Sequence, residues 1–365
     1  MTATDVAKLA GVSQMTVSRV INDDSRVKEN TRAIVTSAIK KLGYEPNKAA
    51  RSLVSANPIR IGLLYSNPNS TFLSKMLIGV LDRARQSDTQ VVIMTCDDGP
   101  DAVGTVTGLI EDGIDGILLA PPLCDSKLLF EMLIENDMPA VTVGSRHEEK
   151  QISAVFIDDR SAAATMVRHL LSLGHRRIGF IMGDPNQAAS HLRMAGFTKE
   201  FKKAGIPFDQ SLVIPGEFSF RSGFEAAEQL MQSQSPPTAI LASNDDMAAG
   251  AISAARQCGF RIPQDVSICG FDDSLMASQF WPPITTIHQP IDRMTQVAIE
   301  HLENNIRRLR SGIERNTRHI ELDFSLVKRD SDSCPPGVDQ LIDSQKTGNI
   351  ARKYRSSSSR KPTVM

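Results

Sequence analysis

The segment TDVAKLAGVSQMTVSRVIN, residues 4–22, contains two short helical patterns separated by a turn. Gly11 permits that turn, and Ser13 suits the N-cap of the second helix. Thr4 or Asp5 is placed to cap the first helix. The second pattern carries polar side chains where a core helix would be apolar, which raises the question of what this helix contacts.

Apolar residues in this region recur at the three- and four-residue spacing of amphipathic helices. A third such pattern spans 31–42, and Gly43 is placed to end it. The residues predicted to face a common core are Val6, Leu9, Ala10, Val17, Val20, Ile21, Ile34, Val35, Ala38, Ile39 and Leu42. Three short helices with a glycine-containing turn between the first two predict a helix-turn-helix head.

The polar face of the second predicted helix, 14–22, suits contact with DNA. Base edges lie at the bottom of the major groove, so a recognition helix presents polar side chains near its start. Gln pairs with adenine, Arg pairs with guanine and methyl groups pack on thymine, so we expect Gln14, Met15 and Arg19 to read bases. The residues expected to contact phosphates are Thr4, Thr16, Ser18, Asn22, Thr31 and Arg32. A solvated polar face on a three-helix bundle is the alternative reading of this helix.

Composition and charge favour an intracellular protein that contacts a polyanion. Residues 1–60 hold 10 Lys and Arg against 5 Asp and Glu, a net charge of +5, whereas the remainder holds 31 against 37, or −6. An excess of this size also arises by chance. There is neither an apolar run of 18 residues nor the apolar core of a signal peptide. The five cysteines are scattered without a C-x-x-C pair, so we expect reduced thiols, no metal site and a cytoplasmic location.

Residues 4–22, followed by VKENTRAIVTSAIKKLGYEPNKAARSL at 27–53, resemble the start of the lac/gal repressor family of transcriptional regulators. D-V-A, A-G-V-S, T-V-S-R-V-I-N, L-G-Y-x-P-N and A-R-S-L all stand at the family's spacing. The resemblance implies a short hinge helix that forms on DNA and contacts the minor groove through Asn47, Ala50, Arg51 and Leu53. Leu53 would be the wedge, because an apolar wedge bends the duplex onto more protein surface. An ordinary linker leucine is the alternative.

From residue 59 the pattern changes to apolar runs that alternate with helical stretches. The runs predict parallel strands buried on both faces, in two similar α/β units. They are RIGLLYS, VVIMTCDD, GILLAPP, AVTVGS and AVFIDD in the first unit, and RIGFIMG, LVIPGEF, AILASN and VSICGFDD in the second. No G-x-G-x-x-G, P-loop, G-x-S-x-G or H-E-x-x-H motif occurs, so the sequence favours neither a nucleotide cofactor nor an enzyme.

The resemblance also implies how the chain is divided. It predicts a helix-turn-helix head at 1–46, a hinge helix and linker at 47–58, an effector-binding and dimerisation body at 59–334, and a disordered tail at 335–365. The body resembles periplasmic sugar-binding proteins, with two doubly wound parallel-sheet subdomains. Their expected ranges are 61–160 with 290–322 for the N-terminal subdomain, and 161–289 with 323–334 for the C-terminal one. The stretch 75–85 is the expected dimer face, although packing on its own sheet explains its apolar residues equally well.

Polar and aromatic residues recur where the predicted strands end, and open α/β sheets bind ligands there. Guanidinium, amide and carboxylate groups suit adjacent sugar hydroxyls, and aromatic faces suit the C–H surface of a sugar. The motifs GHRRIGFI, LRMAGF and IPQDVSICGFDD carry the resemblance through the body to about residue 336. It implies effector contacts by Phe72, Arg193, Phe218, Asn244, Asp272 and Gln289. Aspartates that end strands also cap helices, and phenylalanines are commonly core, so each residue has a purely structural alternative.

Two departures from the family pattern bear on the ligand. Family members that bind purines have an arginine and a threonine where this chain has Gln187 and Ala189, which disfavours a purine. Arg146 and His147 would add positive charge near the cleft if they face it. A neutral sugar, a sugar acid and a phosphorylated sugar therefore all stay open.

The expected function is that of a sequence-specific DNA-binding regulator, a repressor of carbohydrate-utilisation genes. Its affinity for a pseudo-palindromic operator would respond to a small sugar-like effector. We expect a homodimer that acts on nucleoid DNA, with no cofactor and no membrane association. One alternative is a sugar-binding protein for transport, which would need a signal peptide and no basic head. The other is an enzyme, for which no motif supplies an acid–base pair.

Overall fold

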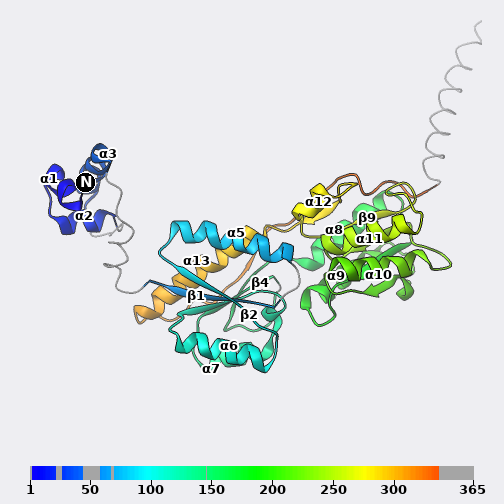
Figure 1. Ribbon diagram of the computed structural model, residues 1–365, viewed down its shortest axis with the longest axis horizontal. Helices are drawn as coiled ribbons and strands as arrows, with labels where there is room; N and C mark the ends of the chain where they lie inside the picture. Colours follow the sequence, from blue (N-terminus) through cyan, green and yellow to red (C-terminus); the bar gives the residue numbers. More distant parts are fainter. Residues whose placement is uncertain (1, 22–26, 44–57, 67–69, 145, 337–365) are drawn as a thin grey trace, which may run out of the picture. The chain divides into compact units, whose positions relative to one another are not determined.

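The computed structural model describes residues 2–21, 27–43, 58–66, 70–144 and 146–336. The chain divides into two compact units, Met1–Pro58 and Ile59–Met365, whose elements are labelled in Figure 1. Residues 47–57 of the predicted hinge and linker (47–58) and residues 337–365 of the predicted tail (335–365) lie outside the described residues.

Three helices form the first unit around a small apolar core. They are α1 (Ala3–Ala10), α2 (Gln14–Ile21) and α3 (Glu29–Leu42). Each helix contributes a fully buried valine to this core: Val6, Val17 and Val35. The predicted helix-turn-helix head is therefore confirmed.

Local signals set the ends of these helices. Gly11 and Gly43 follow α1 and α3 in the left-handed backbone conformation, which glycine adopts without steric cost. The Ser13 hydroxyl accepts a hydrogen bond from the Thr16 N–H at 3.1 Å, so Ser13 caps α2 as predicted.

Two details of the predicted head are wrong. α1 is capped by Thr2, whose hydroxyl accepts from the Asp5 N–H while the Asp5 carboxylate accepts from the Thr2 N–H. This reciprocal box starts the helix before the predicted cap at Thr4 or Asp5. Leu9 and Ile34 were expected in the core but are 45% and 46% exposed, because only a narrow stripe of helices this short reaches the core.

The second unit begins with a six-stranded sheet whose paired strands all run parallel. Its order is β11-β5-β4-β3-β1-β2. The strands are β1 (Arg60–Tyr65), β2 (Gln90–Thr95), β3 (Gly116–Leu119), β4 (Ala140–Gly144), β5 (Ser153–Phe156) and β11 (His319–Glu321). Figure 1 shows α5 (Ser70–Gln86) and α13 (Ile291–Arg310) on one face, with α6 (Pro100–Glu111) and α7 (Lys127–Glu135) on the other.

Alternate residues of the inner strands face these two helical layers. Leu63 and Leu118 belong to the core beneath α5 and α13, whereas Leu64 and Leu119 belong to the core beneath α6 and α7. The prediction of strands buried on both faces is therefore confirmed for β1 and β3. It is wrong for β2, an edge strand with one neighbour, most of whose residues are exposed.

A second parallel sheet, in the order β7-β6-β8-β9, forms the C-terminal subdomain. Its strands are β6 (Ile178–Met182), β7 (Val213–Pro215), β8 (Ala239–Ala242) and β9 (Ser267–Cys269). Its helices are α8 (Asp159–Ser172), α9 (Ala188–Lys203), α10 (Phe220–Met231), α11 (Asp245–Gln257) and α12 (Leu275–Gln279). Phe180 and Leu241 pack towards α8 and α9, and Ile240 and Ala242 pack towards α10 and α11.

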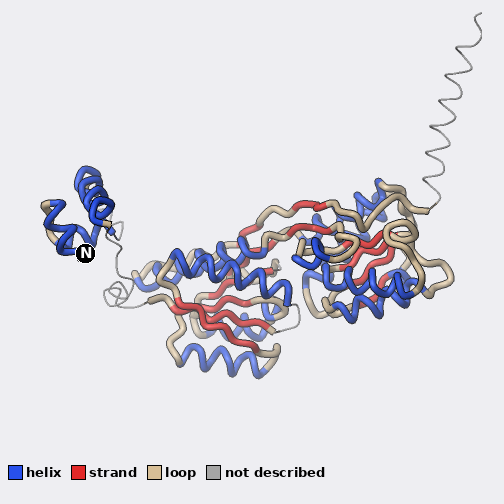
Figure 2. The backbone as a smooth tube through the Cα atoms, turned by 45° about the horizontal axis from the view of Figure 1, so that its top comes forward, coloured by secondary structure: helices blue, strands red, loops and turns tan. Residues whose placement is uncertain are grey.

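The chain passes three times between the two sheets: after β5, after β10 (Thr286–His288), and between β11 and β12 (Ser325–Val327). β10 and β12 pair antiparallel in this connection, which Figure 2 shows as two short strands apart from the two main sheets. In both sheets the strand order reverses next to the first strand, at β1 and at β6. Ligands of doubly wound sheets bind beyond the carboxyl ends of the strands at such a reversal.

Candidate effector pocket and DNA-binding face

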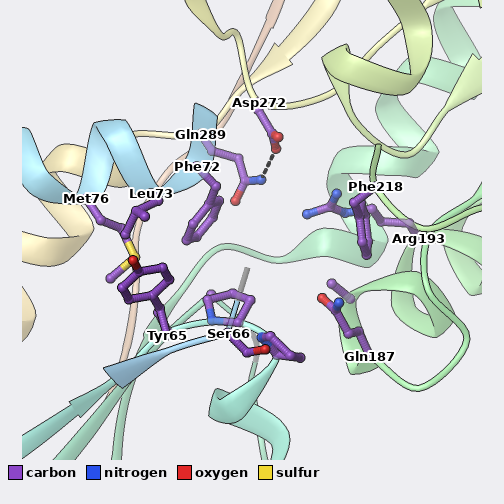
Figure 3. A pocket seen from close by; sticks show the side chains of 15 residues that line it. Tyr65, Ser66, Phe72, Leu73, Met76, Gln187, Arg193, Phe218, Asp272 and Gln289 are labelled. Atoms are coloured by element: carbon purple, nitrogen blue, oxygen red, sulfur yellow. Dashed lines mark hydrogen bonds between the residues drawn. The ribbon is translucent and has the colours of Figure 1, made fainter. Parts of the chain in front are cut away.

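A pocket lies where the carboxyl ends of the first sheet meet the second subdomain. About 740 Å³ of space there is not filled by atoms, a figure that includes open solvent at the mouth of the pocket. Its lining residues are Tyr65, Ser66, Phe72, Leu73, Met76, Ala120, Pro121, Pro122, Gly144, Gln187, Ala189, Arg193, Phe218, Asp272 and Gln289. Five of the six residues predicted to contact an effector are therefore brought together: Phe72, Arg193, Phe218, Asp272 and Gln289 (Figure 3).

Arg193 is the most firmly held of these side chains. It projects from α9 and is 6% exposed. Its Nε donates to Asp159 Oδ1 at 2.8 Å, another guanidinium N–H donates to the Ser243 carbonyl oxygen, and its Cζ lies 3.8 Å from the centre of the Phe271 ring. A guanidinium fixed on this many sides is preorganised to donate its remaining N–H groups to a ligand.

Asp272 and Gln289 form a hydrogen-bonded pair, drawn at the top of Figure 3. The Gln289 Nε2 donates to Asp272 Oδ1 at 2.6 Å, and both residues are buried. Asp272 has a φ of 109°, a strained backbone conformation for a residue with a side chain. The Lys75 ammonium donates to the carbonyl oxygen of Asp272 at 3.0 Å and to that of Asp273 at 2.7 Å, which holds this strained turn against α5.

Burial determines the protonation behaviour of Asp272. It raises the pKa of Asp272 to about 6, although Arg193, Gln289 and Lys75 all act in the opposite direction. Asp245, whose pKa burial and the Asp272 charge raise to about 8, titrates together with Asp272, so this pair of carboxyl groups holds one proton at neutral pH and a second in mildly acidic solution.

Phe72 and Phe218 supply aromatic faces from the two subdomains, and Figure 3 shows their rings on opposite sides of the pocket. Phe72 lies in the first turn of α5, and Phe218 follows β7 with a φ of 56°. A Cβ at Gly183 would lie 2.0 Å from the Phe218 ring, so the absent side chain at Gly183 makes room for the ring.

Asn244 is the predicted contact that the structure places elsewhere. It caps α11: its Oδ1 accepts from the Met247 N–H at 2.9 Å, and its Nδ2 donates to the Phe218 carbonyl oxygen at 2.9 Å. It is buried and is absent from the pocket lining. In this structure Asn244 fixes the backbone of Phe218, and its contact with an effector stays a prediction.

Arg146 and His147 also lie away from this pocket, and line cavities beside it. The His147 ring packs between the rings of Phe130 and His319, at 4.8 and 4.9 Å between ring centres. Burial lowers the pKa of His147 to about 4, so the ring is neutral at pH 7. Neither residue brings positive charge to the pocket lining.

The predicted DNA-reading side chains of the head lie at its surface. Gln14, Met15 and Arg19 on α2 are exposed, Met15 by 65% despite being apolar. Of the predicted phosphate contacts, Thr4 is exposed and Thr16, Thr31 and Arg32 are half-buried. The remaining predicted DNA contacts lie outside the described residues or, for Ser18, have an undescribed side chain: Ser18, Asn22, Asn47, Ala50, Arg51 and Leu53.

Two further searches cover the described part of the chain only. No group of three or more His, Cys, Asp or Glu side chains there is arranged to hold a metal ion. None of the helices in those segments has the length and hydropathy that a membrane crossing requires.

Comparison with known proteins identifies the family. Residues 2–47 match the family described as "Bacterial regulatory proteins, lacI family", and residues 167–331 match the "Periplasmic binding protein-like domain". The HTH-type transcriptional regulator DegA of Bacillus subtilis is 35% identical over 80% of this chain and 87% of its own length. The chain belongs to the lacI family of regulatory proteins.

Other lacI-family proteins match over greater lengths. The HTH-type transcriptional repressor PurR of Photorhabdus laumondii is 33% identical over 93% of this chain and 98% of its own. Two solved structures, each covering 91% of this chain and 99% of their own, are similar: a complex of the transcriptional regulator CelR with cellobiose (31% identity, TM-score 0.69) and a lac repressor dimer bound to operator and the anti-inducer ONPF (30%, 0.68). This lacI-family protein is a DNA-binding transcriptional regulator and not an enzyme.

Several pocket residues were not predicted from the sequence of this lacI-family protein. Tyr65 ends β1, Ser66 follows it, and Pro121 and Pro122 follow β3, so the strand-end rule that selected Asp272 also applies to them. Met76 lies four positions after Phe72, on the same side of α5, and Leu73 is the residue next to Phe72. Helical spacing from a predicted contact was the signal that could have found Met76.

Proposed function

We propose that this regulator is a dimeric repressor of carbohydrate-utilisation genes, and that a sugar-like effector bound in the pocket controls its operator affinity. One observation carries the proposal. A buried guanidinium, carboxylate and amide, those of Arg193, Asp272 and Gln289, converge on a space between two aromatic rings. The rings belong to Phe72 and Phe218, on different subdomains.

This chemistry suits a polyhydroxylated ring. Adjacent hydroxyls both donate and accept, so they pair with a guanidinium on one side and a carboxylate on the other. The C–H faces of a sugar are apolar and pack on phenylalanine rings. The cellobiose complex of CelR, a similar structure, supports a sugar as the ligand class.

A purine is the competing ligand, because PurR repressors are among the relatives and two aromatic rings also suit a flat base. Gln187 and Ala189 line the pocket at the positions where purine-binding members have an arginine and a threonine. The pocket thus lacks the pair that the family resemblance associates with purines, and this favours a sugar.

At the DNA end, we propose that Gln14, Met15 and Arg19 read bases in the major groove. Their exposure at the start and on the outer side of α2 supports this role. Contacts to phosphate by Thr4, Thr16, Ser18, Asn22, Thr31 and Arg32, and to the minor groove by Asn47, Ala50, Arg51 and Leu53, complete the proposed interface.

Contacts across the pocket offer a route from ligand to DNA. Lys75 of the N-terminal subdomain binds backbone carbonyls of the C-terminal one, and the Thr71 hydroxyl donates to the Asp246 carboxylate at 3.3 Å. An effector that touches both subdomains favours the arrangement that completes its contacts. A coupling of about 1–3 kcal/mol between the effector and operator sites is typical of such systems.

A ligand screen followed by DNA binding tests the proposal. Sugars, sugar acids, sugar phosphates and nucleobases are screened by thermal shift, and each hit is added to a selected operator in a binding assay. We expect a sugar to stabilise the protein and change its operator affinity, and Arg193→Ala to lose the response while unliganded DNA binding is retained. If guanine or hypoxanthine binds and no sugar does, the effector is a purine and the proposed sugar effector is wrong. A normal response in Arg193→Ala would place the effector elsewhere.

A further inference from the structure

The charge of the pocket limits the kinds of sugar that it accepts, provided that the proposed effector site is correct. Among the described residues that line the pocket, only Arg193 and Asp272 carry a charge at neutral pH. A sugar acid or sugar phosphate needs a positive group whose charge is not already balanced. Whether a neighbouring carboxylate already balances the Arg193 charge therefore decides between neutral and anionic ligands.

That charge is balanced from behind the pocket. Asp159, the first residue of α8, is 1% exposed, and its Oδ1 accepts from Arg193 Nε at 2.8 Å. Asp272 is near enough for Arg193 to lower its pKa against the effect of burial. Two buried carboxylates, those of Asp159 and Asp272, thus face a single guanidinium.

Among the described residues, no other cationic side chain lines the pocket. The Lys75 ammonium lies outside the lining, bound to two backbone carbonyl oxygens of the C-terminal subdomain, and its charge partly offsets that of Asp272. Arg146 and His147 line other cavities. Two further side chains at the subdomain boundary are acidic: Asp125 accepts from the Ala188 N–H, and Asp246 accepts from Thr71.

We propose that the effector is an uncharged sugar, and that Asp159 sets this selectivity by neutralising Arg193 without touching the ligand. Burial raises the pKa of Asp159, and the charge and hydrogen bond of Arg193 oppose this shift, so the ion pair keeps the Asp159 carboxylate ionised. A sugar hydroxyl accepts from N–H groups of Arg193 and donates to Asp272, and it brings no charge into the site. A carboxylate or phosphate would be the third anion around one guanidinium in a buried environment, where like charges repel strongly. Asp159 is thus a specificity-determining residue that acts through Arg193.

The first experiment measures ligand class on the unaltered full chain. Glucose, galactose, ribose and cellobiose are each compared by calorimetry with the corresponding aldonate, and the monosaccharides also with their terminal phosphates. We expect at least one neutral sugar to bind about tenfold or more tightly than its charged counterparts. A charged counterpart that binds as tightly as the best neutral sugar overturns the inference and leaves the proposed sugar-responsive function intact.

The second experiment tests Asp159 itself. Asp159→Asn keeps the size of the side chain and an oxygen for Arg193 Nε, but removes the balancing charge. We expect the ratio of aldonate affinity to neutral-sugar affinity to rise about tenfold or more. The matched control is Asp158→Asn, an equal charge change one residue away. Asp158 caps α8 through the Ser161 N–H at 3.0 Å, which asparagine also does, and it has no contact with Arg193.

Each outcome tests either the role of Asp159 in selectivity or the proposed sugar effector. An unchanged ratio in Asp159→Asn, or an equal rise in Asp158→Asn, shows that Asp159 does not set selectivity. If Asp159→Asn does not fold, Asp159→Ser removes the same charge with a smaller side chain and is expected to raise the same ratio. If no sugar of any charge binds while operator binding is normal, the proposed sugar effector fails, and this inference fails with it.

Discussion

The buried charge of Asp272, which we propose binds the ligand, destabilises the unliganded protein. Its carboxylate is buried, its pKa is raised to about 6, and its backbone has a φ of 109°. A raised pKa means that the folded state binds the proton more tightly than the unfolded state does. The ionised carboxylate therefore lowers the free energy of unfolding, and the loss grows as pH rises from about 4 through about 6.

Asp272→Asn is accordingly expected to stabilise the unliganded protein at neutral pH, by about 2 kcal/mol. Asparagine carries no charge, and its amide oxygen still accepts from Gln289. The stabilisation is expected to grow by about 1 kcal/mol between pH 5 and pH 8. Thermal melting of both proteins across this range checks it. The same variant is expected to bind the effector weakly at every pH, and a stability difference that does not change with pH would contradict the argument.

A second single residue, Arg19 on α2, tests the proposed reading of bases. Arg19→Ala is expected to cost about 1–3 kcal/mol in operator binding and to relax base preference at the position it reads. Titration of operator and random DNA with the variant provides the measurement. Lys8→Ala, which removes an equal charge from exposed α1, is the control and is expected to leave base preference unchanged. Equal losses on both DNAs in Arg19→Ala would show that Arg19 contacts phosphate.

Position in the sequence predicted most of the pocket residues. It did not predict whether a given side chain lines the pocket or caps a helix. Asp272 and Asn244 both follow a strand that ends in the same part of the C-terminal subdomain. Asp272 lines the pocket, whereas Asn244 caps α11 and binds the Phe218 backbone. A capping side chain and a ligand-binding side chain occupy the same place after a strand, so sequence alone does not separate them. Asp159 was missed for a related reason, because it acts behind Arg193.

At the scale of elements, the placement of α9 decides where Arg193 lies. α9 begins at Ala188, whose N–H donates to Asp125 Oδ2 at 2.9 Å. Asp125 lies in a short 3-10 helix of the N-terminal subdomain, Leu123–Asp125. One subdomain thus supplies a carboxylate to the free N-terminus of a helix in the other, where the helix dipole favours negative charge.

Asp125→Ala is therefore expected to weaken effector binding about fivefold, the effect of losing one capping interaction. Calorimetry with the effector identified by the screen is the measurement. Because burial raises the pKa of Asp125 to about 6, removing its carboxylate also relieves a desolvation cost, so no large fall in melting temperature is expected. Asp209→Ala, which removes a cap within a single subdomain, should leave effector affinity unchanged. An equal loss in both variants would argue against a link between subdomains.

The elements differ in how well the sequence predicts them. Long apolar runs identified nine of the ten strands of the two sheets, all but β11, because strands buried on two faces leave little room for polar residues. The exposure of β2 was not predictable, since its run VVIMTCDD resembles those of the inner strands and only the sheet order makes it an edge. β10, β11 and β12 have three residues each, too few for a periodic pattern.

At the scale of the whole molecule, an operator with two half-sites requires two copies of the head. We propose that two bodies associate through α5 and β2. Within the predicted dimer face 75–85, Met76 and Val80 are buried in the core of their own subdomain, which is the alternative packing that the sequence left open. The exposed apolar residues on this surface are instead Ile78 (51%) and Leu81 (60%) on α5, with Ile93 (43%) and Met94 (40%) on β2. Exposed large apolar side chains are candidates for association surfaces, and Leu81 and Ile93 are the two whose contribution we propose to test.

Leu81→Glu and Ile93→Glu are each expected to weaken dimerisation by about 1.5–3 kcal/mol, the stabilisation that a buried aliphatic side chain contributes. Sedimentation velocity over a range of concentrations measures this. Operator binding at low protein concentration should fall with it, because a monomer occupies one half-site only. Ile313→Glu, at a residue 49% exposed after α13, introduces the same charge elsewhere and is expected to leave both properties unchanged. A dimer that persists in both α5 and β2 variants, with unaltered operator affinity, would exclude this surface and require the two heads to be held together by another part of the body.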